Sequence, residues 1–161
     1  RKFHSSRIPT DVIKTIIQCG IEAPSSCNRQ SWRFITISRD TDKQFVADIR
    51  NIGFIKSTPL IICVLVNDDV YRNAHERNIT AIMDASAATM NIITACEACG
   101  LGSCWINFLA SVSPESVDVF KKHFNIRENV RPMTLIAVGD SAQSIEKPRR
   151  DEIDQYWLGS Y

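Results

Sequence analysis

Apolar residues recur along the first half of the chain at two spacings, one typical of helices and one typical of strands. Residues 8–24, IPTDVIKTIIQCGIEAP, carry Ile and Val at helical spacing between Pro9 and Pro24, which predicts an amphipathic helix. Residues 31–38, SWRFITIS, alternate apolar and polar positions well enough for a strand, and residues 40–50 follow as a short helix. The first half therefore predicts a helix, a strand and a second helix.

Three extended segments are predicted in the second half of the chain. Residues 59–66, PLIICVLV, form a continuous apolar run rich in β-branched residues, which predicts a strand buried on both faces. Residues 131–140, RPMTLIAVGD, predict another buried strand. Between them, residues 99–108, CGLGSCWINF, read as a tight turn at Gly100 that leads into an extended apolar segment.

A short helix with a clear start signal is predicted over residues 113–124, SPESVDVFKKHF. Ser113 is the expected N-cap, Pro114 occupies the first helical position, and Glu115 places a negative charge in the first turn. The segment after the last predicted strand, residues 147–157, is polar and charged. No repeat or linker divides the chain, so residues 1–161 are expected to form a single domain.

A long helix is predicted over residues 78–99, where neither Gly nor Pro occurs. Small or apolar residues cover nearly its whole circumference, which is typical of a buried helix. Its small residues, Ala85, Ser86, Ala87 and Ala88, would let another backbone approach closely. A helix of about 22 residues is roughly 33 Å long, which is difficult to cover with one small chain. A homodimer is therefore expected.

Composition and charge exclude some classes of partner. The 161 residues carry 19 basic and 18 acidic side chains, a net charge of +1, which argues against a large binding surface for nucleic acid or anionic lipid. No apolar run reaches the roughly 20 residues of a membrane span, so a soluble, cytoplasmic protein is expected. Because the chain opens on Arg1, a segment before it is expected to have been removed or left out.

Six cysteines lie mostly in apolar stretches, which favours a reducing compartment over a disulfide framework. The spacing of Cys96, Cys99 and Cys104 could suggest a metal cluster. Cys96 and Cys99, however, lie inside an apolar helical run, which favours small buried hydrophobic side chains instead. No metal site is predicted.

The candidate chemistry centres on residues 23–34, APSSCNRQSWRF. Pro24 stops the preceding helix, which leaves the polar groups that follow it available for other contacts; these residues are Ser25, Ser26, Asn28 and Gln30. A flat heterocycle with donors and acceptors along one edge would suit them. A turn that caps itself through Ser and Asn is an equal alternative.

Two basic clusters stand at opposite ends of the chain: Arg1, Lys2 and Arg7, and Lys147, Arg149 and Arg150. Each could bind a phosphate group, because arginine forks match phosphate oxygens and a dianion needs more than one cation. The alternative is a pair of solvated termini.

Nucleophilic catalysis is weakly supported. Ser25 with His75 or His123 could form a hydrolase pair, but no Gly-x-Ser-x-Gly elbow is present. Cys27 is a better candidate nucleophile, because a polar loop could expose its thiolate.

Three motifs together resemble the FMN-dependent nitroreductase family. APSSCNRQSWRF resembles that family's Ala-Pro-Ser-Ser-x-Asn-x-Gln-Pro-Trp signature, with Ser31 in place of the usual Pro. DASAATMNIITACEACGLGSCWI resembles the long central helix and its Gly-Leu-Gly turn, and RPMTLIAVGD resembles the strand before the closing segment. The resemblance extends from Arg1 to about Arg150.

This resemblance implies an α+β nitroreductase-like fold: a central sheet flanked by helices, a long buried central helix, and two chains interlocked in a homodimer with FMN in the interface. Ser25, Ser26, Asn28 and Gln30 would lie along the flavin, and the basic residues of the closing segment, Lys147, Arg149 and Arg150, would meet the phosphate. Trp105, Ile106 and Asn107 would lie beside the ring, with a backbone amide facing it. Arg1 would be the last basic residue of an Arg-x-Ser-x-Arg pattern and would favour the negatively charged reduced flavin.

The function that the resemblance implies is an NAD(P)H-driven, ping-pong, two-electron reduction of an electron-poor small molecule such as a nitroaromatic or a quinone. Two alternatives stay open. One is a relative with a dedicated reaction, such as dehalogenation, dehydrogenation or flavin breakdown. The other is a flavin-binding module without turnover.

Overall fold

A four-stranded antiparallel sheet forms the centre of the molecule, in the order β1-β2-β4-β3. The computed structural model describes residues 1–144, 146, 148–157 and 159. The strands are β1 (Trp32–Ile37), β2 (Leu60–Asn67), β3 (Gly102–Asn107) and β4 (Val130–Gly139). All four occur where the sequence predicts extended chain.

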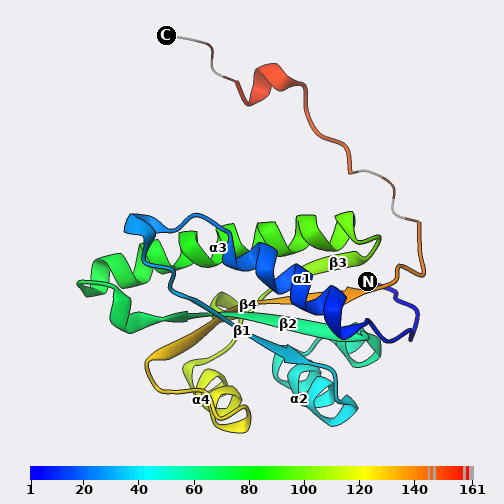
Figure 1. Cartoon of the computed structure of the whole chain (residues 1–161), viewed down its shortest axis with the longest axis horizontal. Coiled ribbons are helices and arrows are strands. Elements are labelled where there is room, and N and C mark those ends of the chain that lie inside the picture. Colours follow the sequence, from blue (N-terminus) through cyan, green and yellow to red (C-terminus); the bar gives the residue numbers. More distant parts are fainter. Residues whose placement is uncertain (145, 147, 158, 160–161) are drawn as a thin grey trace.

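Two layers of helices cover this sheet (Figure 1). The helices are α1 (Thr10–Ile21), α2 (Asp40–Arg50), α3 (Ala74–Ala98) and α4 (Pro114–His123), and short 3-10 turns complete the connections. α1 and α3 lie on one face of the sheet, and α2 and α4 lie on the other. A sheet with helices on both faces confirms the predicted α+β class.

The two central strands are buried on both faces, because β2 and β4 each lie between other strands and between the helix layers. Alternate residues of β2 divide between the layers: Ile62 and Val64 pack against α1 and α3, whereas Ile61 and Cys63 pack against α2 and α4. Side chains of successive strand residues point to opposite faces, so one continuous apolar run serves both layers. The prediction that the continuous apolar run of β2 forms a strand buried on both faces is confirmed.

The residues predicted to begin α4 and to end α3 have the expected conformations and contacts. Ser113 Oγ accepts a hydrogen bond from the Ser116 amide at the start of α4, with Pro114 as the first helical residue. Gly100, after the end of α3, has φ +73°, the left-handed conformation that favours glycine at this position.

α3 differs from its prediction at its first turn, and the single chain leaves one of its faces uncovered. It begins at Ala74 rather than at residue 78, because the Asn73 side chain accepts a hydrogen bond from the Glu76 amide and caps an additional polar turn. It is also not buried on every side. Its inner face packs on α1 and the sheet, but its outer face exposes large apolar side chains: Ile79, Ile82, Met83 and Met90.

By length and composition alone, α3 could cross a membrane. Ala88, Ile92 and Cys96 of its inner face are buried in the core of the molecule, and Asp84 lies near the middle of the helix. This packing is that of a core helix.

The N-terminal segment joins the sheet at the C-terminal end of β4. Phe3 bridges Ser141 just beyond that strand, and the His4 amide donates to the carbonyl oxygen of Asp140. Past this bridge the chain leaves the helices and the sheet, and the segment that contains the short turn Ile153–Gln155 extends away from them (Figure 1).

Candidate functional site

The loop between α1 and β1 has an unusual backbone. Cys27, Asn28 and Gln30 have φ values of 51°, 52° and 51°, in the left-handed region that residues other than glycine seldom adopt. The Gln30 amide donates to Ser25 Oγ (2.9 Å), and Gln30 Nε2 donates to Asn28 Oδ1 (3.0 Å). The self-bonded turn considered from the sequence is therefore present, while the side chains of Asn28 and Gln30 remain exposed.

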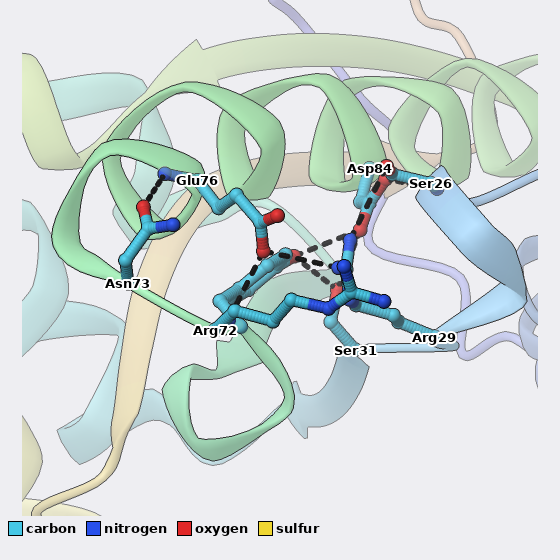
Figure 2. Close-up of polar contacts among 8 residues, drawn as sticks. Ser26, Arg29, Ser31, Arg72, Asn73, Glu76 and Asp84 are labelled. Carbon is cyan, nitrogen blue, oxygen red and sulfur yellow. Dashed lines mark hydrogen bonds and ion pairs between the residues drawn. The ribbon is translucent and has the colours of Figure 1, made fainter.

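Asp84, a buried carboxylate on α3, holds both ends of this loop (Figure 2). Its Oδ1 accepts a hydrogen bond from the Ser26 amide at 2.9 Å. Its Oδ2 lies 3.2 Å from Ser31 Oγ and 2.8 Å from the Tyr71 hydroxyl. No ion pair with Asp84 occurs among the residues that the structure describes, so hydrogen bonds alone compensate for the burial of its charge.

Tyr71 and Ser31 complete this cluster. The two hydroxyl oxygens are 2.7 Å apart, and both residues are buried. Burial raises the pKa of the Tyr71 hydroxyl, and its hydrogen bond to Asp84 raises it further. The phenol therefore stays protonated and can act as a donor at neutral pH.

A second contact fixes the loop from its outer side. Arg29 pairs with Glu76 of α3 at 3.0 Å, and its guanidinium lies 5.8 Å from the centre of the Tyr71 ring. Glu76 also accepts a hydrogen bond from the Arg72 amide. The loop is thus attached to the first half of α3 at several points.

The second part of the candidate site lies at β3, an edge strand whose outer side has no neighbouring strand in the described sheet. Trp105 and Asn107 are exposed on the face that α3 covers, whereas Ile106 is buried on the opposite face. Two cavities flank this edge. One, of about 250 Å³, lies between β3 and α3 and includes Ile82 and Ser86 in its lining.

The other cavity, of about 290 Å³, brings Arg1 and Arg50 to the residues predicted to lie beside the flavin, Trp105, Ile106 and Asn107. Arg50 Nη1 donates to the carbonyl oxygen of Ser111 at 2.8 Å. Its Nε is buried and has no hydrogen-bond partner among the described residues. Burial lowers the pKa of Arg50, but a guanidinium remains charged at neutral pH.

A buried donor without a partner is costly, and the same donor beside an anion or a carbonyl group is favourable. The described ion pairs include neither Arg1 nor Arg50. This cavity can therefore receive a polar edge or an anionic group, with the β3 backbone on one side.

Within one chain, the loop after α1 and the N-terminus lie at opposite ends of β4. The Asn67 amide donates to the Ser31 carbonyl where β4 begins, and Phe3 bridges Ser141 where it ends. Ten strand residues span roughly 30 Å. The N-terminus and the loop after α1 accordingly lie at opposite ends of the molecule (Figure 1). One chain does not bring Ser25, Ser26, Asn28 and Gln30 to Arg1.

The basic residues of the C-terminal segment are also separate from Arg1 in the single chain. Arg149 and Arg150 line a surface cavity together with neighbours from their own segment, Asp151, Glu152 and Gln155. Lys147 lies outside the described residues.

The alternative catalytic residues are not assembled. Ser25 Oγ accepts from Gln30, and His123 lies under the opposite face of the sheet, paired with Asp42. The hydrogen bonds of the described residues link Ser25 neither to that histidine nor to His75.

The cysteines also do not assemble into a site. All six thiols are free: Cys27 is exposed, and burial raises the pKa of Cys96 to about 12. In the part of the chain that the structure describes, no group of His, Cys, Asp or Glu side chains could hold a metal ion.

Three residues of the site have no local sequence signal. Tyr71 and Asp84 lie 40 and 53 positions from Ser31 in the chain. Arg50 ends a helix that otherwise belongs to the opposite layer. Asp84, an acidic residue among small and apolar neighbours in α3, hints at a buried polar contact, but nothing local in the sequence identifies its partners.

Comparison with known proteins agrees with this architecture. The Nitroreductase family profile matches residues 1–53 and 51–140. An NADPH-flavin oxidoreductase of Vibrio harveyi is 26% identical over 159 residues, which span 92% of this chain and 65% of that protein. A protein of Methanothermobacter thermautotrophicus, provisionally named NADH dehydrogenase/NAD(P)H nitroreductase, is 24% identical over 147 residues, which span 89% of this chain and 73% of its own length.

A solved structure has the same fold. The FMN-dependent nitroreductase of Clostridium difficile superposes with a TM-score of 0.80 and 22% identity, over 99% of this chain and 91% of that one. The family profile covers the segments that carry the three sequence motifs. The chain therefore belongs to the nitroreductase family of oxidoreductases.

Proposed function

We propose that the protein is a cytoplasmic, FMN-dependent oxidoreductase that takes electrons from NAD(P)H and reduces an electron-poor small molecule of the nitroaromatic or quinone type in a ping-pong cycle. The Vibrio harveyi relative is named an NADPH-flavin oxidoreductase. A nitroreductase-fold protein from Desulfovibrio desulfuricans, with a TM-score of 0.85 and 23% identity over 99% of this chain and 90% of that one, was solved in complex with FMN. Family membership supports the class of reaction, and the residues of this chain support the cofactor.

The observation that carries the proposal is the cavity of about 290 Å³ beside β3 that contains Arg1 and Arg50. Its two cations, Arg1 and Arg50, and the unpartnered Nε of Arg50 suit the polar edge of a flavin, which carries carbonyl and ring-nitrogen acceptors. Trp105, Ile106 and Asn107 also line this cavity, and their strand lies at the edge of the sheet. The residues present therefore fit the pyrimidine side of FMN.

FMN, when bound, supplies the two-electron redox chemistry, and the protein supplies position and charge. Arg1 and Arg50 would offset negative charge on the cofactor. The backbone of β3 at Asn107 would orient its ring, and Ser25, Ser26, Asn28 and Gln30 would contact its polar atoms. Arg149, Arg150 and Lys147 would meet the phosphate.

A homodimer is part of the proposal, because one chain holds the loop after α1 and the N-terminus at opposite ends of β4, roughly 30 Å apart. The outer face of α3 offers a surface for a second copy: Ile79, Ile82, Met83 and Met90 are 49–65% exposed and follow helical spacing along one stripe. Ile82 of this stripe also lines the cavity of about 250 Å³ between β3 and α3. A dimer packed through α3 would give each site residues from both chains.

The direct test is the visible absorption spectrum of the purified protein after incubation with FMN and removal of free flavin, recorded before and after addition of NAD(P)H. A bound flavin spectrum that bleaches with NAD(P)H and returns with a nitroaromatic or quinone supports the proposal. A yellow protein without turnover indicates a binding module, and turnover restricted to another acceptor indicates a dedicated reaction. A protein that takes up no FMN refutes the assignment.

A further inference from the structure

The loop that would contact the flavin is under backbone strain. Cys27, Asn28 and Gln30 are all left-handed without being glycine. Such conformations cost free energy and persist only where the surrounding structure holds them. The contacts that hold this loop are therefore part of how the binding surface is made.

Those contacts converge on one carboxylate. Asp84 binds the Ser26 amide just before the strained residues and the Ser31 hydroxyl just after them. Hydrogen bonds to an ionised acceptor are roughly twice as strong as those between neutral groups. One buried side chain on a rigid helix thus spans the strained segment from both ends (Figure 2).

Tyr71 adds further contacts to this attachment. Its hydroxyl lies within hydrogen-bond distance of both Asp84 and Ser31, and its ring lies beneath Arg29, which is itself paired to Glu76. Tyr71 is 5% exposed, Ser31 0% and Asp84 3%, so water does not compete for these bonds.

Ser31 is the member of this cluster that departs from the family signature, in which Pro follows Gln. A proline at position 31 would have no hydroxyl for Asp84 or Tyr71. It would also favour an extended conformation at the residue before it, whereas Gln30 has φ 51°. In this chain, Ser31 permits the left-handed conformation of Gln30, and its hydroxyl attaches the loop to Asp84 of α3.

We propose that Asp84, Ser31 and Tyr71 form a latch that holds the loop of Ser25, Ser26, Asn28 and Gln30 in its flavin-binding conformation. The three latch residues are positioning residues, which act through the loop and need not touch the cofactor. This inference rests on the proposed function, because the loop must be a flavin contact for the latch to affect binding.

The test compares FMN dissociation constants for four variants of the full chain: Ser31→Ala, Ser31→Pro, Tyr71→Phe and Asp42→Asn. The first three weaken the latch and leave Asp84 in place, so that the fold is retained. Asp42→Asn is the matched control, because Asp42 is a buried carboxylate of the other helix layer, hydrogen-bonded to His123.

Each latch variant is expected to weaken FMN binding roughly tenfold, the size of one hydrogen bond to a charged group. The control is expected to lower the melting temperature and leave FMN affinity within twofold of the parent. Ser31→Pro is the sharpest case, because it restores the family residue and is still expected to bind FMN less tightly. Unchanged FMN affinity in folded Ser31→Ala and Tyr71→Phe would overturn the latch.

Hydrogen exchange of the Ser26 amide separates this inference from the proposed function. If the parent protein binds no FMN, the assignment of function fails, but the latch still predicts faster exchange at Ser26 in Ser31→Ala and Tyr71→Phe than in Asp42→Asn. If the Ser26 amide exchanges at the same rate in all of these variants, Ser31 and Tyr71 do not help Asp84 to hold the loop.

Discussion

His123 of α4 lies 3.0 Å from the carboxylate of Asp42 on α2, and this pair joins the two helices that cover the lower face of the sheet. The ring of Phe45 stacks on the imidazole, with ring centres 3.8 Å apart. Arg39 binds the second oxygen of Asp42 at 2.6 Å. Asp42 is therefore a buried carboxylate with two charge-assisted contacts, near the opposite end of α2 from Arg50.

This pair predicts a defined loss of stability in acid. The hydrogen bond from His123 lowers the pKa of Asp42 against the opposing effect of burial, with Arg39 as a further cause. Because the folded pKa is below the unfolded one, the stabilisation is complete above the ordinary value of about 4 and is lost as the pH falls through the folded value.

The measurement is chemical denaturation of the parent and of Asp42→Asn between pH 7 and pH 3. At pH 7 the variant is expected to lose about 1.5–3 kcal/mol of unfolding free energy, the range for hydrogen bonds to a charged group. The difference is expected to shrink at the acidic end. A difference that stays constant with pH would show that the charge of Asp42 is not the source of the stability.

The position of Arg50 predicts that FMN binding requires a positive charge in this cavity. Arg50→Met removes a cation and its buried, unpartnered Nε from the cavity beside β3. FMN affinity is expected to fall about tenfold or more, as for loss of a hydrogen bond to a charged group. Arg50→Lys keeps the charge and is expected to lose less. Quenching of FMN fluorescence measures the FMN affinity of the parent, Arg50→Met and Arg50→Lys.

The control for this substitution is Arg127→Met, which removes an exposed cation that lines a different cavity. Its FMN affinity is expected to match that of the parent. If both variants lose the same affinity, the effect comes from net charge rather than from the position of Arg50.

The outer stripe of α3 predicts the oligomeric state. Met83→Asp places a charge at a residue that is 65% exposed in the single chain and central to the proposed interface. The dimer dissociation constant is expected to rise at least tenfold, about 1.4 kcal/mol, and FMN binding is expected to fall with it. Sedimentation velocity across a concentration series measures the first effect.

Val119→Asp is the matched control, since Val119 is 52% exposed on α4, on the opposite face of the molecule. It is expected to change neither association nor flavin binding. A parent protein that sediments as a monomer at all concentrations would contradict the shared site.

Gly20 predicts a tight contact between α1 and α3. A methyl group at this position would lie 2.8 Å from Ile92 Cγ1 of the core. Gly20→Ala is expected to lose about 1–3 kcal/mol from overpacking, more than the gain of about 1 kcal/mol in helix propensity. Thermal or denaturant unfolding measures the change.

The comparison variant is Gly53→Ala, where no atom lies within 4 Å of the added methyl group. It is expected to be close to neutral. Stabilisation by Gly20→Ala would mean that α1 and α3 are farther apart than the core contacts indicate.

Local patterns in the sequence determined most of the secondary structure. The alternation in β1, the continuous apolar run of β2 and the capping residues of α4 each report a local backbone preference or a two-sided burial, and such signals lie within a few residues of the element they define. The start of α3 was placed four residues late because its first turn is polar and depends on the Asn73 cap rather than on apolar spacing.

The residues expected at the site followed from motifs, but their arrangement depended on tertiary structure. The sequence alone indicated Arg1, Ser25 and Asn107 as members of one site, whereas the antiparallel path of β4 separates the first two by the length of the strand. Packing between distant segments also created the contacts of Asp84 and left Arg50 Nε without a partner. Interactions between residues tens of positions apart leave no periodic signal, so only the folded chain could reveal them.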